Sequence, residues 1–330
     1  MWIMKRQWKM IALVVLGAFL LAGCGAPAEN KVVQDNEEQA ILKIGLLRID
    51  DSLPFYIAEQ EGLFEKQGVK VELIGFSSGK DQSIALESGE LDGLMTDMVV
   101  QGLLKKSGTD IKAVAMALGA TPAEGRFLVV AAPSSEIRTP TDLAGKRVAI
   151  SNNTMMDYLM ESFAEPADFD YDSVELVNMP DLMLRVTTLL EGKDIDAAIL
   201  PDPLAAYAVY EGAHVVIDDT QLGENLSQSV VAVTEQALAD KHDEVAKMLA
   251  AYNEAIELIN ADPEAYRALC LKTASVPEEL ADSYPIPSYT ANTVPDEASV
   301  QRIMDWLVQR GLIDNAYTYK DVVDGEFLHE

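Results

Sequence analysis

The sequence predicts an α/β protein made of two successive α/β units followed by a helical tail. Strands and helices alternate from residue 41 to residue 118, and the alternation begins again near residue 126. From Glu235 onward, the apolar residues follow a helical spacing instead. Such an alternation is typical of a mostly parallel sheet covered by helices.

The first unit contains four predicted strands separated by three helices. Apolar residues at helical spacing mark the first helix, and Gly68 is placed to end it. The predicted strands are Ile41–Leu47, Val69–Ile74, Leu91–Met95 and Ile111–Leu118, and the helices are Pro54–Gln67, Lys80–Ser88 and Met98–Lys106.

The second unit repeats this pattern, and the tail departs from it. The strands are Phe127–Ala132, Lys146–Ile150, Val174–Val177, Ile195–Leu200 and His214–Ile217, with helices Met155–Phe163, Leu182–Glu191 and Pro203–Glu211. The tail helices are Glu235–Ile259, Pro263–Lys272 and Asp296–Arg310. We expect them to pack on one or both units, because they cannot bury their apolar faces alone. Two such units suggest a ligand cleft beyond the carboxyl ends of the strands.

The composition excludes several classes of protein. The chain has 330 residues, with 25 Lys and Arg against 54 Asp and Glu, for a formal net charge of -29. Such an acidic chain is a poor partner for nucleic acid, which is bound through clusters of basic residues. Three His and two Cys are too few for a zinc ribbon, an iron–sulfur cluster or a disulfide scaffold. We therefore expect no metal and no cofactor.

The N-terminus has the pattern of an export signal. Lys5, Arg6 and Lys9 precede the uncharged run Met10–Ala22, whose 13 residues fall short of the roughly 20 that span a bilayer. The run ends in Leu-Ala-Gly-Cys at Cys24, which resembles a bacterial lipobox. That resemblance implies a signal peptide at 1–23, a lipidated Cys24 with a flexible tether at 24–40, and a membrane anchor facing the extracytoplasmic side.

One motif suggests a hydrolase. Residues 75–79 read G-x-S-x-G between a strand and a helix, which would make Ser77 a nucleophile. It would need one of the candidates His214, His242 or His329 as a base, and no glycine-rich oxyanion segment is visible. We favour a polar loop whose Ser77 or Ser78 caps the next helix or touches a ligand.

Four segments together resemble bacterial solute-binding proteins of ABC importers. Residues 139–150 read T-x-x-D-L-A-G-K-R-V-A-I, like the entry to the second lobe of those proteins. Residues 54–72, 85–92 and 189–203 are similar to runs of the alkanesulfonate, nitrate and thiamine-pyrimidine-precursor binding group. The resemblance covers about residues 41–315. It implies a two-lobe, type II periplasmic-binding-protein-like fold, with lobe 1 at 41–125 and 229–330 and lobe 2 at 126–228.

By the same resemblance, the chain crosses between lobes near Thr121–Phe127 and Asn225–Ser229. The expected ligand-binding residues are Arg48, Asp50, Asp51, Phe55, Phe76, Ser77, Ser78, Thr96, Asp97, Arg126, Asn152, Asn153, Thr154 and Asp202, with no catalytic residue.

Each of these residues also has a structural alternative. Phe55 begins an amphipathic helix, so it can be a core residue, whereas Phe76 in a loop is better placed to stack on a ligand. Asp50, Asp51 and Asp97 could bind an amine or cap helices, and one residue of 152–154 should cap a helix while another faces the ligand. Arg48 and Arg126 are the natural partners of an anion, or surface charges.

The expected function is capture of a small organic molecule by hinge closure and its delivery to an ABC permease, by a monomer without covalent chemistry. The expected ligand is a pyrimidine-like, amine or sulfonate compound. Acids outnumber bases in the expected rim loops, which favours a pyrimidine-like or amine ligand over a simple oxyanion. The alternatives are a methionine-type binding lipoprotein, a pyrimidine-precursor synthase and a serine hydrolase.

Overall fold

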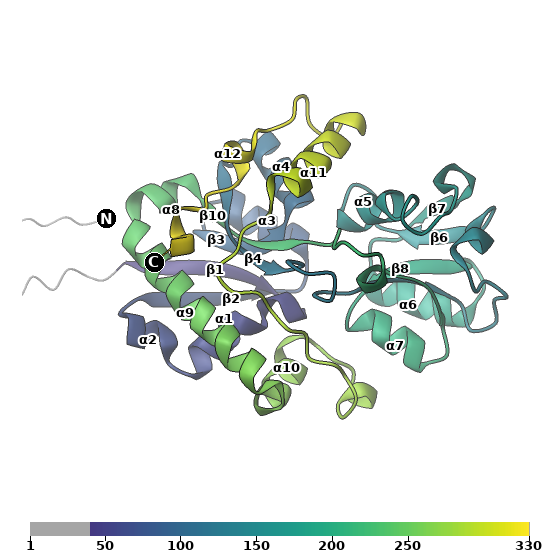
Figure 1. Cartoon of the computed structure of the whole chain (residues 1–330), viewed down its shortest axis with the longest axis horizontal. Helices are drawn as coiled ribbons and strands as arrows, with labels where there is room; N and C mark the ends of the chain where they lie inside the picture. The colour runs from purple at the N-terminus through teal and green to yellow at the C-terminus, as the bar shows by residue number, and fades with distance from the viewer. Residues whose placement is uncertain (1–39, 330) are drawn as a thin grey trace, which may run out of the picture. The chain divides into compact units, whose positions relative to one another are not determined.

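The computed structural model describes residues 40–329 (Figure 1). The expected signal peptide, the lipidation site Cys24 and nearly all of the tether lie outside the described residues. Among residues 40–329, no helix is both long enough and apolar enough to cross a membrane.

The first sheet has the strand order β2-β1-β3-β10-β4. β1 runs parallel to β2 and β3, whereas β10 runs antiparallel to β3 and β4. The strands are β1 Ile41–Leu47, β2 Lys70–Phe76, β3 Gly93–Asp97, β4 Ile111–Leu118 and β10 Ser229–Thr234.

Helices cover both faces of the first sheet (Figure 1). Leu42, Ile44 and Leu46 of β1 alternate along the strand and pack with α1 and α9 on one face. Leu94 of β3 belongs to the cluster of α4 and α11 on the other face. The helices are α1 Leu53–Gln60, α2 Leu63–Gln67, α3 Gly79–Glu87, α4 Met98–Ser107, α8 Glu235–Asp240, α9 His242–Ala261, α10 Arg267–Thr273, α11 Glu297–Gln309 and α12 Tyr319–Val322.

The second sheet has the order β7-β6-β8-β5-β9, with β5 antiparallel to β8 and β9. Tyr158 and Leu159 of α5 pack on one face of this sheet, and α6 and α7 cover the other. The strands are β5 Phe127–Ala131, β6 Arg147–Ile150, β7 Glu175–Asn178, β8 Ala197–Pro201 and β9 His214–Asp218, and the helices are α5 Met155–Ser162, α6 Leu182–Glu191 and α7 Leu204–Tyr210.

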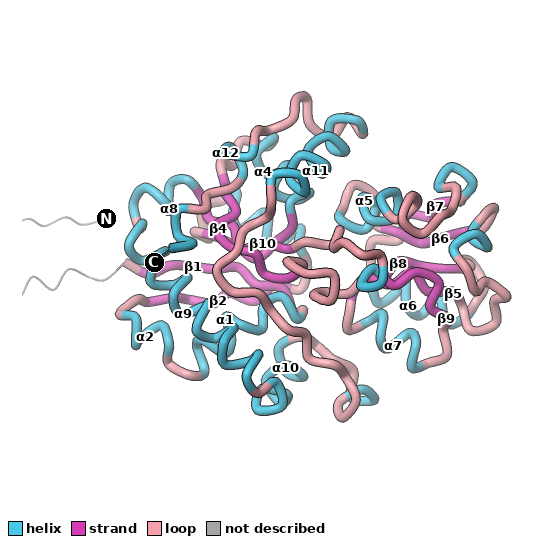
Figure 2. Tube along the Cα trace, in the orientation of Figure 1, coloured by secondary structure: helices cyan, strands magenta, loops and turns pink. Residues whose placement is uncertain are grey.

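The chain passes between the sheets twice, through segments that are mostly loop (Figure 2). Residues 119–126 lead from the end of β4 to the start of β5, and residues 219–228 lead from the end of β9 to the start of β10. Each crossing enters a sheet at the edge where its parallel strands end, so the entering strand must run back from that edge. The sheets are mostly parallel, as predicted, since only β10 in the first sheet and β5 in the second run against the other strands. The strand β10 itself was not predicted.

The predicted helix Pro263–Lys272 is a 3-10 helix at Pro263–Tyr266 followed by α10. Two further predicted helices are divided at a local turn. The helix expected at Pro54–Gln67 breaks before Gly62, whose φ of 66° is left-handed and ends α1. The helix expected at Glu235–Ile259 breaks at Lys241, whose φ of -132° and ψ of 34° are not helical. In both places the apolar spacing continues across a local turn, so periodicity alone could not show the break.

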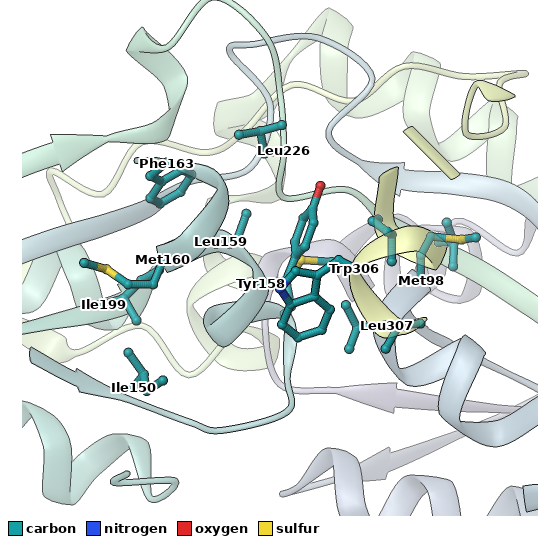
Figure 3. Packing of buried hydrophobic residues seen from close by; sticks show 14 of the residues in the cluster. Met98, Ile150, Tyr158, Leu159, Met160, Phe163, Ile199, Leu226, Trp306 and Leu307 are labelled. Carbon is teal, nitrogen blue, oxygen red and sulfur yellow. The ribbon is translucent and has the colours of Figure 1, made fainter. Parts of the chain in front are cut away.

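One apolar cluster contains residues of both sheets (Figure 3). Met98 of α4 and Leu307 of α11 belong to it, as do Ile150 of β6 and Ile199 of β8. α11 lies very close to α4, since a Cβ added at Gly102 would stand 2.5 Å from Leu307 Cδ1. The tail helix α11 therefore completes this shared core.

Candidate functional site

The candidate site is formed by the loops that follow the strands at the crossing edge of each sheet. In the first sheet, these are the loops after β1, β2 and β3, together with Ser229 at the start of β10, which pairs with Asp97. In the second sheet, they are the loops after β6 and β8, with Arg126 before β5. Burial is the main cause that raises the pKa of Asp50 in the first sheet, and the charge of Asp202 in the second sheet adds a smaller contribution in the same direction.

Asp50 faces inward from the loop after β1. Its side chain accepts a hydrogen bond from the Tyr284 hydroxyl and lies 3.9 Å from Cys270 Sγ, while Tyr289 donates to its carbonyl at 2.9 Å. Burial raises the pKa of Asp50 to about 8, although the Tyr284 hydrogen bond opposes the shift. Asp50 is therefore mostly neutral at pH 7 and is held by the tail.

Asp51 and Asp97 lie beside each other at the same edge. Burial raises the pKa of Asp51, against a hydrogen bond with Ser229. Asp97 caps α4 by accepting from Val100 N at 2.8 Å, and burial together with the Asp51 charge raises its pKa to about 6. Both readings of Asp97 thus remain compatible with its position: it caps a helix at the edge where a ligand would lie.

Arg126 and Asp202 form an ion pair at the second edge. Arg126 Nε and Nη2 lie 2.7 and 3.2 Å from the two carboxylate oxygens, and Asp202 also accepts from Ala206 N at 3.0 Å. The Arg126 side chain is 30% exposed and that of Asp202 is 9% exposed. The guanidinium expected for an anionic ligand is thus already paired with a carboxylate. Arg48, by contrast, is exposed and has no ion pair or hydrogen bond through its side chain among the described residues.

The loop after β6 contains one residue that caps α5 and two residues that are exposed. Thr154 caps α5 by accepting from Met156 N at 3.2 Å, and its hydroxyl donates to Ser151 O at 2.6 Å. Asn152 and Asn153 are exposed, and Asn153 has a left-handed φ of 59°. Its backbone N–H donates to Asp157 Oδ2 at 2.8 Å, which supports that conformation.

The remaining expected residues divide between core and rim. Phe55 is fully buried, and its ring centroid lies 4.7 Å from that of Tyr252, so it is a core residue that presents no surface to a ligand. Phe76 is partly buried against the core, and Thr96 is buried within β3. Ser78 caps α3 by accepting from Asp81 N at 3.1 Å, while Ser77 is exposed.

Ser77 has no histidine beside it among the described side chains. His214 Nε2 lies 3.1 Å from Pro133 O, and the ring nitrogens of His242 lie 3.7 Å from an oxygen of Asp243 and 3.3 Å from an oxygen of Glu326. The side chain of His329 lies outside the described part of the chain. A nucleophile needs a base within hydrogen-bond reach, and neither described histidine supplies one.

Sequence reasoning missed a set of buried polar groups around the crossings. Glu124 accepts from Ala120 N at 3.0 Å, and Asn225 Nδ2 donates to Thr121 O at 3.2 Å. Asp219 accepts from Phe127 N at 3.0 Å and Ser227 Oγ at 2.8 Å, and burial raises its pKa to about 7. These contacts brace the two crossings against each other.

Arg185 was also missed. It is fully buried, donates to Met179 O at 2.9 Å and Ile199 O at 2.9 Å, and has no carboxylate within hydrogen-bond distance. Burial lowers its pKa to about 10. It ties the loop after β7 to β8. No signal in the sequence distinguished this Arg from those on the surface of a helix.

The sequence is similar to a known protein family and to two binding proteins. The family model described as NMT1/THI5 like matches residues 50–266. An ABC transporter periplasmic binding protein of Brachyspira hyodysenteriae is 26% identical over 277 residues, covering 79% of this chain and 76% of that protein. An aliphatic sulfonates-binding protein of Bacillus subtilis is 25% identical, covering 97% of this chain and 96% of that protein.

Solved structures show the same fold. The periplasmic aliphatic sulphonate binding protein SsuA from Escherichia coli has a TM-score of 0.72 at 21% identity, covering 86% of this chain and 92% of that one. The desulfurization enzyme DSZB has a TM-score of 0.61 at 15% identity, covering 88% and 98%. The fold is thus the two-lobe α/β fold of periplasmic binding proteins, and it is also used by an enzyme.

Proposed function

The chain belongs to the NMT1/THI5-like family, and we propose that it is an extracytoplasmic solute-binding lipoprotein of an ABC importer. It captures a small organic molecule between the two sheets by hinge closure and delivers it to the permease. The lipid anchor is Cys24, from the N-terminal pattern. The names of the relatives support the transport class.

One observation carries the proposal. Both crossings join the edges at which the strand-end loops of the two sheets lie, and buried hydrogen bonds brace these crossings. A rotation about the crossings therefore opens or closes the space between these loops. Helix N-termini capped by Asp97 and Thr154 lie at the two edges, where backbone N–H groups can bind a polar ligand.

For the ligand, we propose a pyrimidine-like, amine or sulfonate compound. The relatives named for sulfonates favour the last of these, and exposed Arg48 offers a cation for it. The carboxylates of Asp51 and Asp97 favour an amine or a heterocyclic N–H. Arg126 is the weaker anion partner because Asp202 already pairs with it.

We propose no covalent chemistry for this site. Ser77 lacks a described histidine partner, whose presence would have supported a hydrolase. An active-site serine probe tests this. It should label neither the protein nor its Ser77→Ala variant, whereas a serine hydrolase treated in parallel should be labelled. Labelling that disappears in Ser77→Ala would overturn the binding function.

A thermal-shift screen tests the binding function. The chain from residue 25 onward should be stabilised by at least one member of a panel of sulfonates, pyrimidines, amines, methionine and nitrate. A ligand at one hundred times its dissociation constant adds about 2.7 kcal/mol to the free energy of unfolding. If the ligand is an amine, Asp51→Asn should weaken its binding; if it is a sulfonate, Arg48→Gln should weaken its binding. Asp243→Asn is the control, because Asp243 is exposed. A panel without any stabilising compound would contradict the proposal.

A further inference from the structure

Two helices that belong to different sheets are joined by a group of polar contacts outside the crossings. Trp306 Nε1 of α11 donates to Glu161 Oε2 of α5 at 2.7 Å, and Arg310 Nη2 donates to Asp157 Oδ1 at 2.6 Å. The rings of Trp306 and Tyr158 meet edge to face at 5.6 Å (Figure 3). We call Trp306 and Arg310 with Asp157, Tyr158 and Glu161 the clasp.

The clasp is more than a loose surface contact. The Asp157 side chain is 4% exposed, and Trp306 is 6% exposed. Arg310 also lies 5.5 Å from the Trp306 ring and 3.2 Å from the Tyr171 hydroxyl. A buried carboxylate that loses its cation stays desolvated with an uncompensated charge, so separating α11 from α5 is unfavourable unless water reaches Asp157.

Asp157 links the clasp to the loop after β6. Its Oδ1 receives Arg310, while its Oδ2 receives the backbone N–H of Asn153 at 2.8 Å. Asn153 has a left-handed φ of 59°, a conformation that needs support from its surroundings. The same carboxylate thus holds a loop of the candidate site on one side and the tail helix on the other.

The two sides of the clasp belong to different parts of the fold. α11 packs on α4 of the first sheet through Leu307, and α5 packs on the second sheet through Leu159. The clasp can therefore form only when the two sheets have the relative position seen here. A rotation about the crossings that moves α5 away from α11 would break its hydrogen bonds and release Asp157.

We propose that Trp306 and Arg310 are positioning residues: they hold the two sheets together and, through Asp157, hold the Asn153 loop in its binding conformation. This inference rests on the proposed function, because it assigns the clasp a part in the hinge motion of a solute-binding protein. The clasp favours the arrangement of the two sheets seen here before any solute is bound, and it couples that arrangement to the shape of the Asn153 loop.

Distance measurements between spin labels test, without any ligand, whether Trp306 and Arg310 hold the two sheets together. Labels at Lys70→Cys and Lys193→Cys report on the two sheets, and the fully buried Cys270 stays unlabelled. In the full chain in detergent, Arg310→Gln and Trp306→Phe should lengthen and broaden the distance distribution. The matched control is Arg147→Gln, which breaks an Arg–Asp pair, with Asp196, within the second sheet. It should leave the distribution unchanged.

Hydrogen–deuterium exchange tests whether Arg310, through Asp157, holds the conformation of the Asn153 loop. Arg310→Gln should speed exchange in the peptide that contains residues 151–155, and Arg310→Lys, which keeps the charge, should restore part of the protection. Arg147→Gln should not change it. If Arg310→Gln does not fold, Trp306→Phe decides, because it keeps an aromatic six-membered ring and removes the five-membered part of the indole with its N–H donor.

An unchanged distance distribution or unchanged exchange in the clasp variants would overturn the proposal. Neither readout uses a ligand, so these outcomes are independent of the thermal-shift screen. A screen without any stabilising compound would overturn the binding function and leave the mechanical role of the clasp measurable.

Discussion

Single residues at the strand ends have roles that their type alone does not reveal. Asp50, Asp97 and Asp202 stand at similar positions after strands, but one accepts from a buried tyrosine, one caps a helix and one pairs with Arg126. The difference comes from the partner that the tertiary structure brings to each carboxylate. A sequence shows where the acids are, whereas their partners come from distant segments such as 284–289.

The buried Asp50 should make stability fall as the pH rises. Its pKa is raised from 3.8 to about 8, so between these values the folded state keeps a proton that the unfolded state has released. The free energy of unfolding therefore decreases through this window, by at most about 1.4 kcal/mol per pH unit from this group. Asp50→Asn should flatten the dependence in urea unfolding at pH 5 to 8.

Asp168→Asn is the control for this prediction, because Asp168 is exposed and its left-handed φ of 54° suits Asn. It should keep the dependence of the parent. If Asp50→Asn and the parent lose stability equally with rising pH, Asp50 is not the group responsible.

At the scale of elements, apolar periodicity predicted most helices and strands near their observed positions. β1, β4 and α6 have the predicted bounds, and α4 and α7 differ by a residue at one or both ends. β10 was missed because Ser229–Thr234 follows directly on a crossing and has no turn signal before it. Its place between β3 and β4 is decided by a segment more than a hundred residues away in the chain.

The close approach of the two crossings requires a glycine at position 119. Gly119 has a φ of 100°, and a Cβ there would stand 2.9 Å from both Asn225 Oδ1 and Gln228 Cα of the other crossing. Gly119→Ala should lower the free energy of unfolding by about 1 kcal/mol for the backbone and by about 1–3 kcal/mol more for the overlap. Chemical denaturation measures this loss.

Gly223→Ala separates the two effects, since Gly223 has a φ of 85° but nothing within 4 Å of its Cβ position. It should show only the backbone loss. Equal losses in the two variants would mean that the crossings do not approach each other as closely as the structure shows.

At the scale of the whole molecule, the acidic excess has a global consequence. With 54 Asp and Glu against 25 Lys and Arg, like charges repel one another across the folded surface. Salt screens this repulsion over a Debye length of roughly 10 Å at 0.1 M. The melting temperature should therefore rise as NaCl is increased from about 0.01 M to about 0.5 M, where screening is strong.

Sodium chloride and choline chloride at equal ionic strength should give similar increases, because screening does not depend on a specific cation. A melting temperature that falls with salt would instead show that the ion pairs, such as Arg126–Asp202 and Arg310–Asp157, dominate the electrostatic contribution.

The sequence by itself determined the fold class, because strand and helix periods are local properties of the chain, and the resemblance of its motifs pointed to the family that the comparisons show. It also placed polar residues at the strand ends. Only the tertiary structure decided what those residues do: it sent Phe55 into the core, paired Arg126 with Asp202 and joined Arg310 to the Asn153 loop. These outcomes depend on contacts between distant segments, and burial and pairing are set by such contacts rather than by neighbours in the chain.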